Sequence, residues 1–152
     1  MKLSTRGEYG LRAMFELAQR YGQGPVSLKS ISERQGISAP YLEQLIASLR
    51  KAGLVRSVRG AQGGYILGRE PSEIRVGDII RVLEGPIAPT ECVSEKRGET
   101  CCTRSETCVA RSVWEKVRDS ISDVLDSITL ADMCDEAARL QSGDAQYVCN
   151  NI

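Results

Sequence analysis

The stretch VSLKSISERQGISAPYLEQLIASLRKAGLV, residues 26–55, carries two short helix patterns separated by a turn. Ser27 is a favourable N-cap residue for the first helix, and Gly36 suits the left-handed conformation that ends it. Ser38 precedes the second helix, and Pro40 falls in its first turn, where a backbone N–H is not needed. Apolar residues recur along the second helix at three- and four-residue steps: Leu42, Leu45, Ile46 and Leu49. The pattern predicts a helix-turn-helix.

A β-hairpin is predicted immediately after this motif. In LVRSVRGAQGGYILGR, residues 54–69, two β-prone runs at Leu54–Val58 and Tyr65–Leu67 flank the glycine-rich turn Gly60–Gly64. A hairpin in this position is the wing of a winged helix. We expect one helix before the motif, starting after Ser4 or Thr5, and another after it at Val76–Leu83. The predicted fold class is therefore mainly α with a small β-hairpin, and residues 1–84 form the winged helix-turn-helix domain.

A long helix is predicted in the second half of the chain. Thr103 and Glu106 have the spacing of a capping box and would start it. Apolar residues then recur as a heptad seam: Ala110, Trp114, Val117, Ile121, Val124 and Ile128. So narrow a stripe favours pairing with a second copy, and packing on the chain's own domain is the alternative. We assign residues 85–102 to a cysteine-bearing loop, 103–133 to a dimerisation helix and its end, and 134–152 to a C-terminal tail.

The charge of the 152-residue chain is unevenly distributed. Residues 1–84 contain 13 Lys or Arg against 8 Asp or Glu, whereas residues 85–152 contain 7 against 12. A basic front half indicates a polyanionic partner such as double-stranded DNA, and a solvated charged face is the alternative. No apolar run is long enough for a signal peptide or a membrane span, so we expect a cytoplasmic protein that binds neither membrane nor small-molecule substrate.

The predicted second helix of the motif would read DNA with its outward face. If its four apolar residues face inward, the outward residues are Glu43, Gln44, Ala47, Arg50 and Lys51. Gln pairs with adenine and Glu accepts from cytosine, whereas the two cations suit phosphates. Arg59, at the tip of the wing, suits a narrow minor groove. A helix-turn-helix that binds protein is the alternative.

Four of the six cysteines lie between residues 92 and 108, and the chain contains no histidine. In a reducing compartment, clustered cysteines are more often metal ligands or redox centres than disulfides. Cys102 and Cys108 would lie at the start of the long helix, whose dipole stabilises thiolates. Structural zinc would require C-x2–4-C pairs, which are absent. A thiol switch and idle thiols remain open, whereas a thiol enzyme would lack a histidine base, so we expect no enzyme.

Three runs resemble the Rrf-type winged-helix family: ISERQGISAPYLEQLIASLRKAGLVRSVRGAQGGYILGR, VGDIIRVLEG and SITLADM. The family includes the iron–sulfur cluster regulator IscR, the nitric-oxide sensor NsrR and the cysteine-metabolism repressor CymR. The resemblance implies a homodimer formed by the long helices and a near-palindromic operator. It also implies DNA contacts by Tyr41, Glu43, Gln44, Ser57 and Arg59. Pro40 departs from the serine of well-studied relatives, so operator preference differs.

The resemblance also implies an iron–sulfur cluster held by Cys92, Cys102 and Cys108, with [2Fe–2S] preferred to [4Fe–4S]. Arg111 occupies the position where relatives with a [2Fe–2S] cluster often have a histidine ligand. The fourth ligand is then Cys101, Glu8 from the partner subunit, or no protein group. The implied function is a repressor or dual regulator that senses cluster status, redox or nitric oxide and controls iron–sulfur assembly genes. The alternative is a cluster-free, CymR-like repressor of sulfur metabolism under the control of thiol oxidation or a partner protein.

Overall fold

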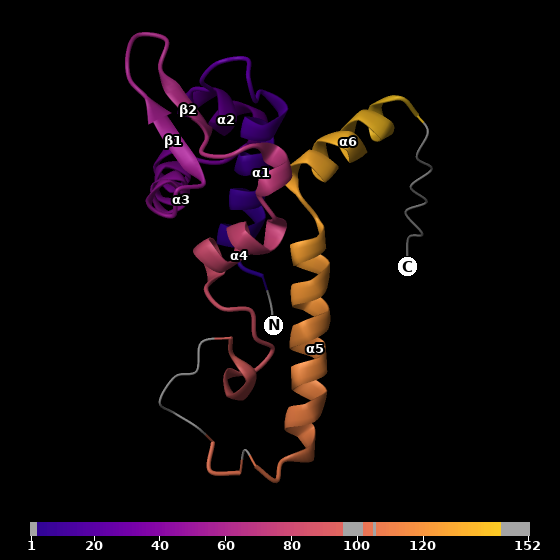
Figure 1. The fold of residues 1–152 in the computed structure, drawn as a ribbon. Coiled ribbons are helices and arrows are strands. Elements are labelled where there is room, and N and C mark those ends of the chain that lie inside the picture. The colour runs from indigo at the N-terminus through magenta and orange to yellow at the C-terminus, as the bar shows by residue number, and fades with distance from the viewer. Residues whose placement is uncertain (1–2, 96–101, 105, 144–152) are drawn as a thin grey trace.

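The computed structural model describes residues 3–95, 102–104 and 106–143. Helices dominate these residues, and a single antiparallel hairpin accompanies them (Figure 1). The winged-helix architecture predicted from the sequence is therefore confirmed. The elements in chain order are α1 (Thr5–Gln19), α2 (Leu28–Gln35), α3 (Ala39–Lys51), β1 (Val55–Val58), β2 (Gly64–Leu67), a 3-10 turn (Pro71–Glu73), α4 (Val76–Glu84), a second 3-10 turn (Glu91–Val93), α5 (Val109–Ser127) and α6 (Leu130–Gln141).

The helix-turn-helix formed by α2 and α3 has the caps that its sequence indicates. The Ser27 hydroxyl accepts a hydrogen bond from the Ser30 amide at 3.1 Å. Gly36 ends α2 with φ 64° and ψ 33°, a conformation that disfavours a side chain. Ser38 occupies the N-cap position of α3 but makes no side-chain capping bond. The apolar stripe of α3 is buried as predicted: Leu42, Leu45, Ile46 and Leu49.

The core of the winged domain lies between α3 and the helices before and after it. Met14 of α1, Ile79 of α4 and Leu130 of α6 are as fully buried as the α3 stripe and belong to the same cluster. The hairpin covers one edge, with Val55 opposite Leu67 and Val58 opposite Gly64. Because Leu130 belongs to this core, the start of α6 packs on the winged domain.

Helix α5 extends away from the winged domain beside α4 (Figure 1). Its C-terminal end is tied to the start of α4, since the Val76 amide donates to the Ile128 carbonyl at 2.9 Å and the Leu130 amide to the Ile74 carbonyl at 3.0 Å. None of its nineteen residues is buried in the single chain. No helix among the described residues combines the length and the hydropathy needed to cross a membrane.

Two sequence expectations about the second half of the chain are wrong. The long helix begins at Val109 with Cys108 as its N-cap, not at the Thr103–Glu106 capping box. Residues 103–104 and 106–107 form turns instead, and the Thr107 amide donates a hydrogen bond to the Arg104 carbonyl. The predicted tail begins inside α6, which a capping box between Thr129 and Asp132 starts. That T-x-x-D spacing is a signal in the sequence that could have located α6.

Candidate functional site: DNA-reading surface and cysteine loop

The outward face of α3 carries the polar side chains predicted to read DNA. Burial of the apolar stripe places Glu43, Gln44, Arg50 and Lys51 on the exposed side of the helix. Glu43 and Gln44 lie in its first half, and the two cations lie at its end. The amide and carboxylate are thus separated from the cations along one surface. Such an arrangement can present the first pair to base edges and the second pair to the phosphate backbone.

The wing adds a second cationic surface beside α3. Ser57 is exposed on β1, and Arg59 directly follows that strand at the tip of the hairpin. Arg56 is exposed on the same strand. Over the described residues, none of Arg50, Lys51, Arg56 and Arg59 has an ion-pair partner. Cations without internal partners are available to neutralise phosphates, and they add the salt-dependent part of the affinity.

Tyr41 differs from the other predicted DNA-contacting residues because it is half-buried and held within the chain. Its hydroxyl lies 3.0 Å from the Thr5 hydroxyl at the start of α1. Its ring packs edge-on against Tyr9, with ring centroids 6.1 Å apart. Tyr41 therefore fixes the first turn of α3 against α1, and its hydroxyl is shared with Thr5.

A polar network between α1 and α2 holds the other half of the motif. Arg12 donates to the Gln35 side-chain oxygen at 2.9 Å and to the Gln35 carbonyl at 2.8 Å. The Gln35 amide in turn donates to Glu16 at 2.6 Å, and Arg34 lies 3.6 Å from the same carboxylate. Glu16 is buried, so its negative charge requires these partners. The sequence did not predict this network, because its two pairs of residues lie on different helices, α1 and α2.

The three predicted cysteine ligands are free and exposed, and they lie on separate segments. Cys92 is in the second 3-10 turn, with its sulfur 3.1 Å from the Thr90 hydroxyl. Cys102 lies in the turn region before α5, and Cys108 is the N-cap of α5. Cys108 is thus placed closer to the positive end of the helix dipole than predicted, and Cys102 is farther from it.

The described residues do not gather three metal-binding side chains around one point. Glu8 is exposed on α1 and is not brought together with the cysteines in the single chain, and Cys101 lies outside the described residues. Arg111, at the position of the expected histidine, forms an ion pair with Glu115 at 3.1 Å. The donor chemistry of three exposed thiols fits an iron–sulfur cluster or another thiophilic metal. Within the described part of the single chain, however, the three thiols are not gathered around one point.

Cys134 belongs to a different environment. It lies on α6, half-buried against the core of the winged domain. Burial raises the pKa of its thiol, and the neighbouring carboxylate of Asp135 raises it further. A thiol held in its neutral form is a poor nucleophile and a poor ligand, so Cys134 is a core residue.

An arginine on α4 joins the cysteine loop to the long helix, and the sequence reading missed it. Arg81 donates to both oxygens of Asp126 on α5, at 2.6 and 2.9 Å, and to both oxygens of Glu95 in the loop, each at 3.0 Å. We call this group the Arg81 clamp. The hydrogen bonds from Arg81 lower the pKa values of Glu95 and Asp126 and raise that of the arginine. All three groups are therefore charged at neutral pH.

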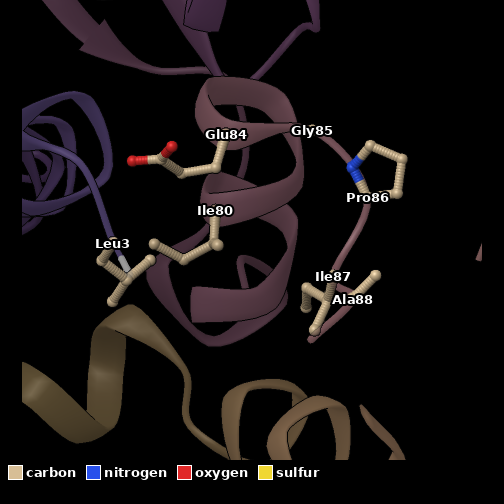
Figure 2. Close-up of a pocket in the computed structure, with 7 residues that line it drawn as sticks. All are labelled: Leu3, Ile80, Glu84, Gly85, Pro86, Ile87 and Ala88. Carbon is tan, nitrogen blue, oxygen red and sulfur yellow. The ribbon is translucent and has the colours of Figure 1, made fainter. Parts of the chain in front are cut away.

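One turn farther along α4, Glu84 anchors the start of α1. One of its oxygens accepts from the Ser4 amide, the Ser4 hydroxyl and the Gly7 amide, at 2.9, 2.5 and 2.9 Å. Partial burial raises the pKa of this carboxyl, but the three hydrogen bonds outweigh that effect and leave it below its ordinary value. Figure 2 shows the carboxylate directed to the side of Leu3, with Pro86 on the opposite side of a cavity of about 170 Å³. Helix α4 thus binds α1 through Glu84 and the cysteine loop through Arg81.

The chain is similar to transcriptional regulators over most of its length. Residues 3–136 match the Rrf2 family, described as "Iron-dependent Transcriptional regulator". The HTH-type transcriptional regulator CymR of Bacillus subtilis (strain 168) is 52% identical over 133 residues, covering 88% of this chain and 89% of CymR. IscR of Serratia proteamaculans (strain 568) is 42% identical over 146 residues, covering 96% of this chain and 87% of IscR.

A solved structure extends this similarity to the fold. The structure of T. potens IscR is 62% identical in sequence and superimposes with a TM-score of 0.73, covering 90% of this chain and 88% of that one. The similarity therefore reaches regulators named for both branches that the sequence indicates, IscR and CymR. The expectation of a regulator rather than an enzyme agrees with these relatives. On the fold, the exposed face of α3 and the match over residues 3–136, the chain belongs to the Rrf2 family of winged-helix transcriptional regulators.

Proposed function

We propose that two copies of this chain pair through α5 and bind a near-palindromic operator. The observation that carries the proposal is the exposed face of α3 and the wing, with four cations that have no partner among the described residues. Glu43 and Gln44 would contact bases, Arg50 and Lys51 phosphates, and Ser57 and Arg59 the DNA beside the wing. Tyr41 would contribute mainly by fixing the start of α3. A dimer would present two such surfaces, as a palindrome requires.

Pairing through α5 is supported by its exposure. Trp114 is 39% exposed, Val113 51% and Val124 58%, although all are apolar. One side of α5 is covered by its own chain, where Ile121 and Leu125 pack against α4. The three exposed apolar residues are not part of that cluster, and an exposed apolar surface favours a covering partner. The heptad spacing of its apolar residues fits a second copy of the same helix.

We further propose that Cys92, Cys102 and Cys108 hold an iron–sulfur cluster, [2Fe–2S] in preference to [4Fe–4S]. When bound, such a cluster would make the regulator sensitive to oxidants, nitric oxide and iron supply. The three thiols are exposed and free to ligate, and Cys108 lies at the N-terminus of α5, where a thiolate is stabilised. Cys101 or Glu8 of the partner subunit would supply a fourth ligand. The regulated genes would include those for iron–sulfur cluster assembly.

A cluster-free repressor of sulfur metabolism is the second candidate. It is favoured by the 52% identity to CymR and by the separation of the three thiols in the described structure. The complete absence of histidine removes the usual fourth ligand. In this case the same cysteines would respond to oxidants directly, or a partner protein would control the DNA affinity.

Iron and sulfide analysis of anaerobically purified protein separates the two candidates. The cluster proposal predicts a brown protein with visible charge-transfer absorbance and matching amounts of iron and sulfide. Cys92→Ala should lose this absorbance, whereas Cys134→Ala, which removes a half-buried thiol on α6, should keep it. A colourless wild-type protein that still binds its operator would exclude the cluster and support the second candidate. A protein that binds no DNA, with or without a cluster, would exclude both candidate functions.

A further inference from the structure

The segment that carries Cys92 is held to the rest of the chain at several points. The Ile87 amide donates to Glu95 at 3.3 Å, and the Ser122 hydroxyl of α5 donates to the same carboxylate at 3.2 Å. Arg118 of α5 donates to the Val93 carbonyl at 2.9 Å. Val93 itself is almost completely buried. Only Val93 and Ser94 separate Cys92 from Glu95, so a constraint on the carboxylate restricts the position of the thiol.

Glu95 is central to these contacts because it accepts from three elements at once. Its oxygens receive hydrogen bonds from Arg81 on α4, Ser122 on α5 and the backbone at Ile87. Arg81 also binds both oxygens of Asp126 on α5. The side chains of the three charged residues are each about 30% exposed, so water screens the clamp only in part. Paired, charge-assisted hydrogen bonds of this kind fix orientation as well as distance.

The backbone of α4 is shaped to admit the clamp. A Cβ atom on Gly77 would lie 1.9 Å from the Asp126 Oδ1 atom and 2.7 Å from the Arg81 Nη1 atom. A larger residue here would displace the ends of these two side chains, so glycine leaves room for the Arg81–Asp126 pair. The clamp is thus built from a helix surface, a loop and a second helix.

We infer that Arg81 is the positioning residue of the cysteine loop, because it binds Glu95 and Asp126 together and so fixes the segment of Cys92 against α4 and α5. The inference rests on the proposed function where it treats Cys92 as a ligand. It adds that this thiol is placed by the protein before any metal arrives. A cysteine ligand that is already ordered loses less conformational entropy when it binds a metal, and the metal is released more slowly. Arg81 touches no metal and acts through Glu95.

Glu95→Gln tests this inference, and Glu91→Gln is its matched control. The first substitution removes the charge that Arg81 binds. The second makes the same chemical change at an exposed position four residues earlier, on the 3-10 turn Glu91–Val93. Hydrogen–deuterium exchange on the metal-free full chain should show faster exchange of peptides covering residues 86–95 in Glu95→Gln, by about tenfold, equivalent to about 1.4 kcal/mol. The exchange rates of peptides from α2 and α3 should not change.

The second measurement is iron release. After anaerobic reconstitution, transfer of iron to a chelator should be about tenfold faster in Glu95→Gln than in wild type or Glu91→Gln, at an unchanged urea midpoint of unfolding. Asp126→Asn provides a second variant if Glu95→Gln folds poorly. Unchanged exchange at residues 86–95 would overturn the inference, and so would faster exchange with unchanged iron release. Absence of iron from wild-type protein would count against the cluster alone, and the exchange comparison would still decide whether Arg81 fixes the segment.

Discussion

Removing part of the exposed apolar seam of α5 should weaken the dimer by a calculable amount. Val124→Ala deletes two carbons from a side chain that is 58% exposed in the single chain. At about 0.8 kcal/mol per buried methylene, scaled by that exposed fraction, each copy loses about 0.9 kcal/mol of new burial on pairing. A two-fold interface contains the residue twice, so the dimer loses about 2 kcal/mol, or about 25-fold in its dissociation constant.

Sedimentation velocity over a dilution series measures this change directly. Val124→Asp should be more severe, because it places a charge in an apolar contact, and should give a monomer at concentrations where wild type is dimeric. Asp123→Ala is the control, since it alters the adjacent exposed residue outside the heptad seam. If both Val124 variants sediment as wild type does, the seam of α5 is not the pairing surface. Pairing of two DNA-binding domains through α5 would then be wrong.

Four further outcomes are expected. Arg59→Ala should weaken operator binding and reduce the slope of log affinity against log salt by about 2 per dimer, since each copy loses about one phosphate contact. Gly36→Ala should lower the free energy of unfolding by about 1 kcal/mol in urea titrations, through backbone strain alone, because no atom lies within 4 Å of the added carbon. Cys134 should react with iodoacetamide more slowly than Cys92, as followed by peptide mass spectrometry, because burial raises the pKa of its thiol. Protection of the first turn of α1 against hydrogen exchange should be complete above the ordinary carboxyl range and lost below it, because hydrogen bonds lower the pKa of Glu84 and are broken when that group is protonated.

For each of these predictions, one result would contradict the reasoning. An unchanged salt slope in Arg59→Ala would remove the wing from the DNA contact. A Gly36→Ala variant as stable as wild type would mean that α2 ends without the left-handed residue. Equal alkylation of Cys134 and Cys92 would show that α6 opens readily from the core. Protection at the start of α1 that persists in acid would assign its stability to apolar packing instead of Glu84.

The sequence predicted the winged domain well because its signals are local. Ser27 and Gly36 act on residues within one helix turn of themselves, and the stripe of α3 is read from a single helix period. The outward positions of Glu43 and Gln44 follow from that stripe with no further information. Local signals also failed in one place: Thr103 and Glu106 have the capping-box spacing but lie in turns before α5.

The contacts that organise the cysteine loop could not be predicted in the same way. Arg81 binds partners 14 and 45 residues away, and no periodicity connects them. Tyr41 was assigned to DNA from the family resemblance, but its packing against Thr5 and Tyr9 depends on how α1 crosses α3. Such contacts are decided by the packing of helices, which a linear pattern does not specify.

The close approach at Gly77 has a consequence for how this chain can change by descent. A methyl group there would force the carboxylate of Asp126 to shift, so a change at one of the two positions affects the other. A descendant that acquires alanine at this point would have to move that carboxylate aside, which would weaken its bonds to Arg81 and leave Glu95 as the firmer partner. Glycine at position 77 is therefore expected to be inherited together with the arginine and the aspartate, because a larger residue there would weaken their contact.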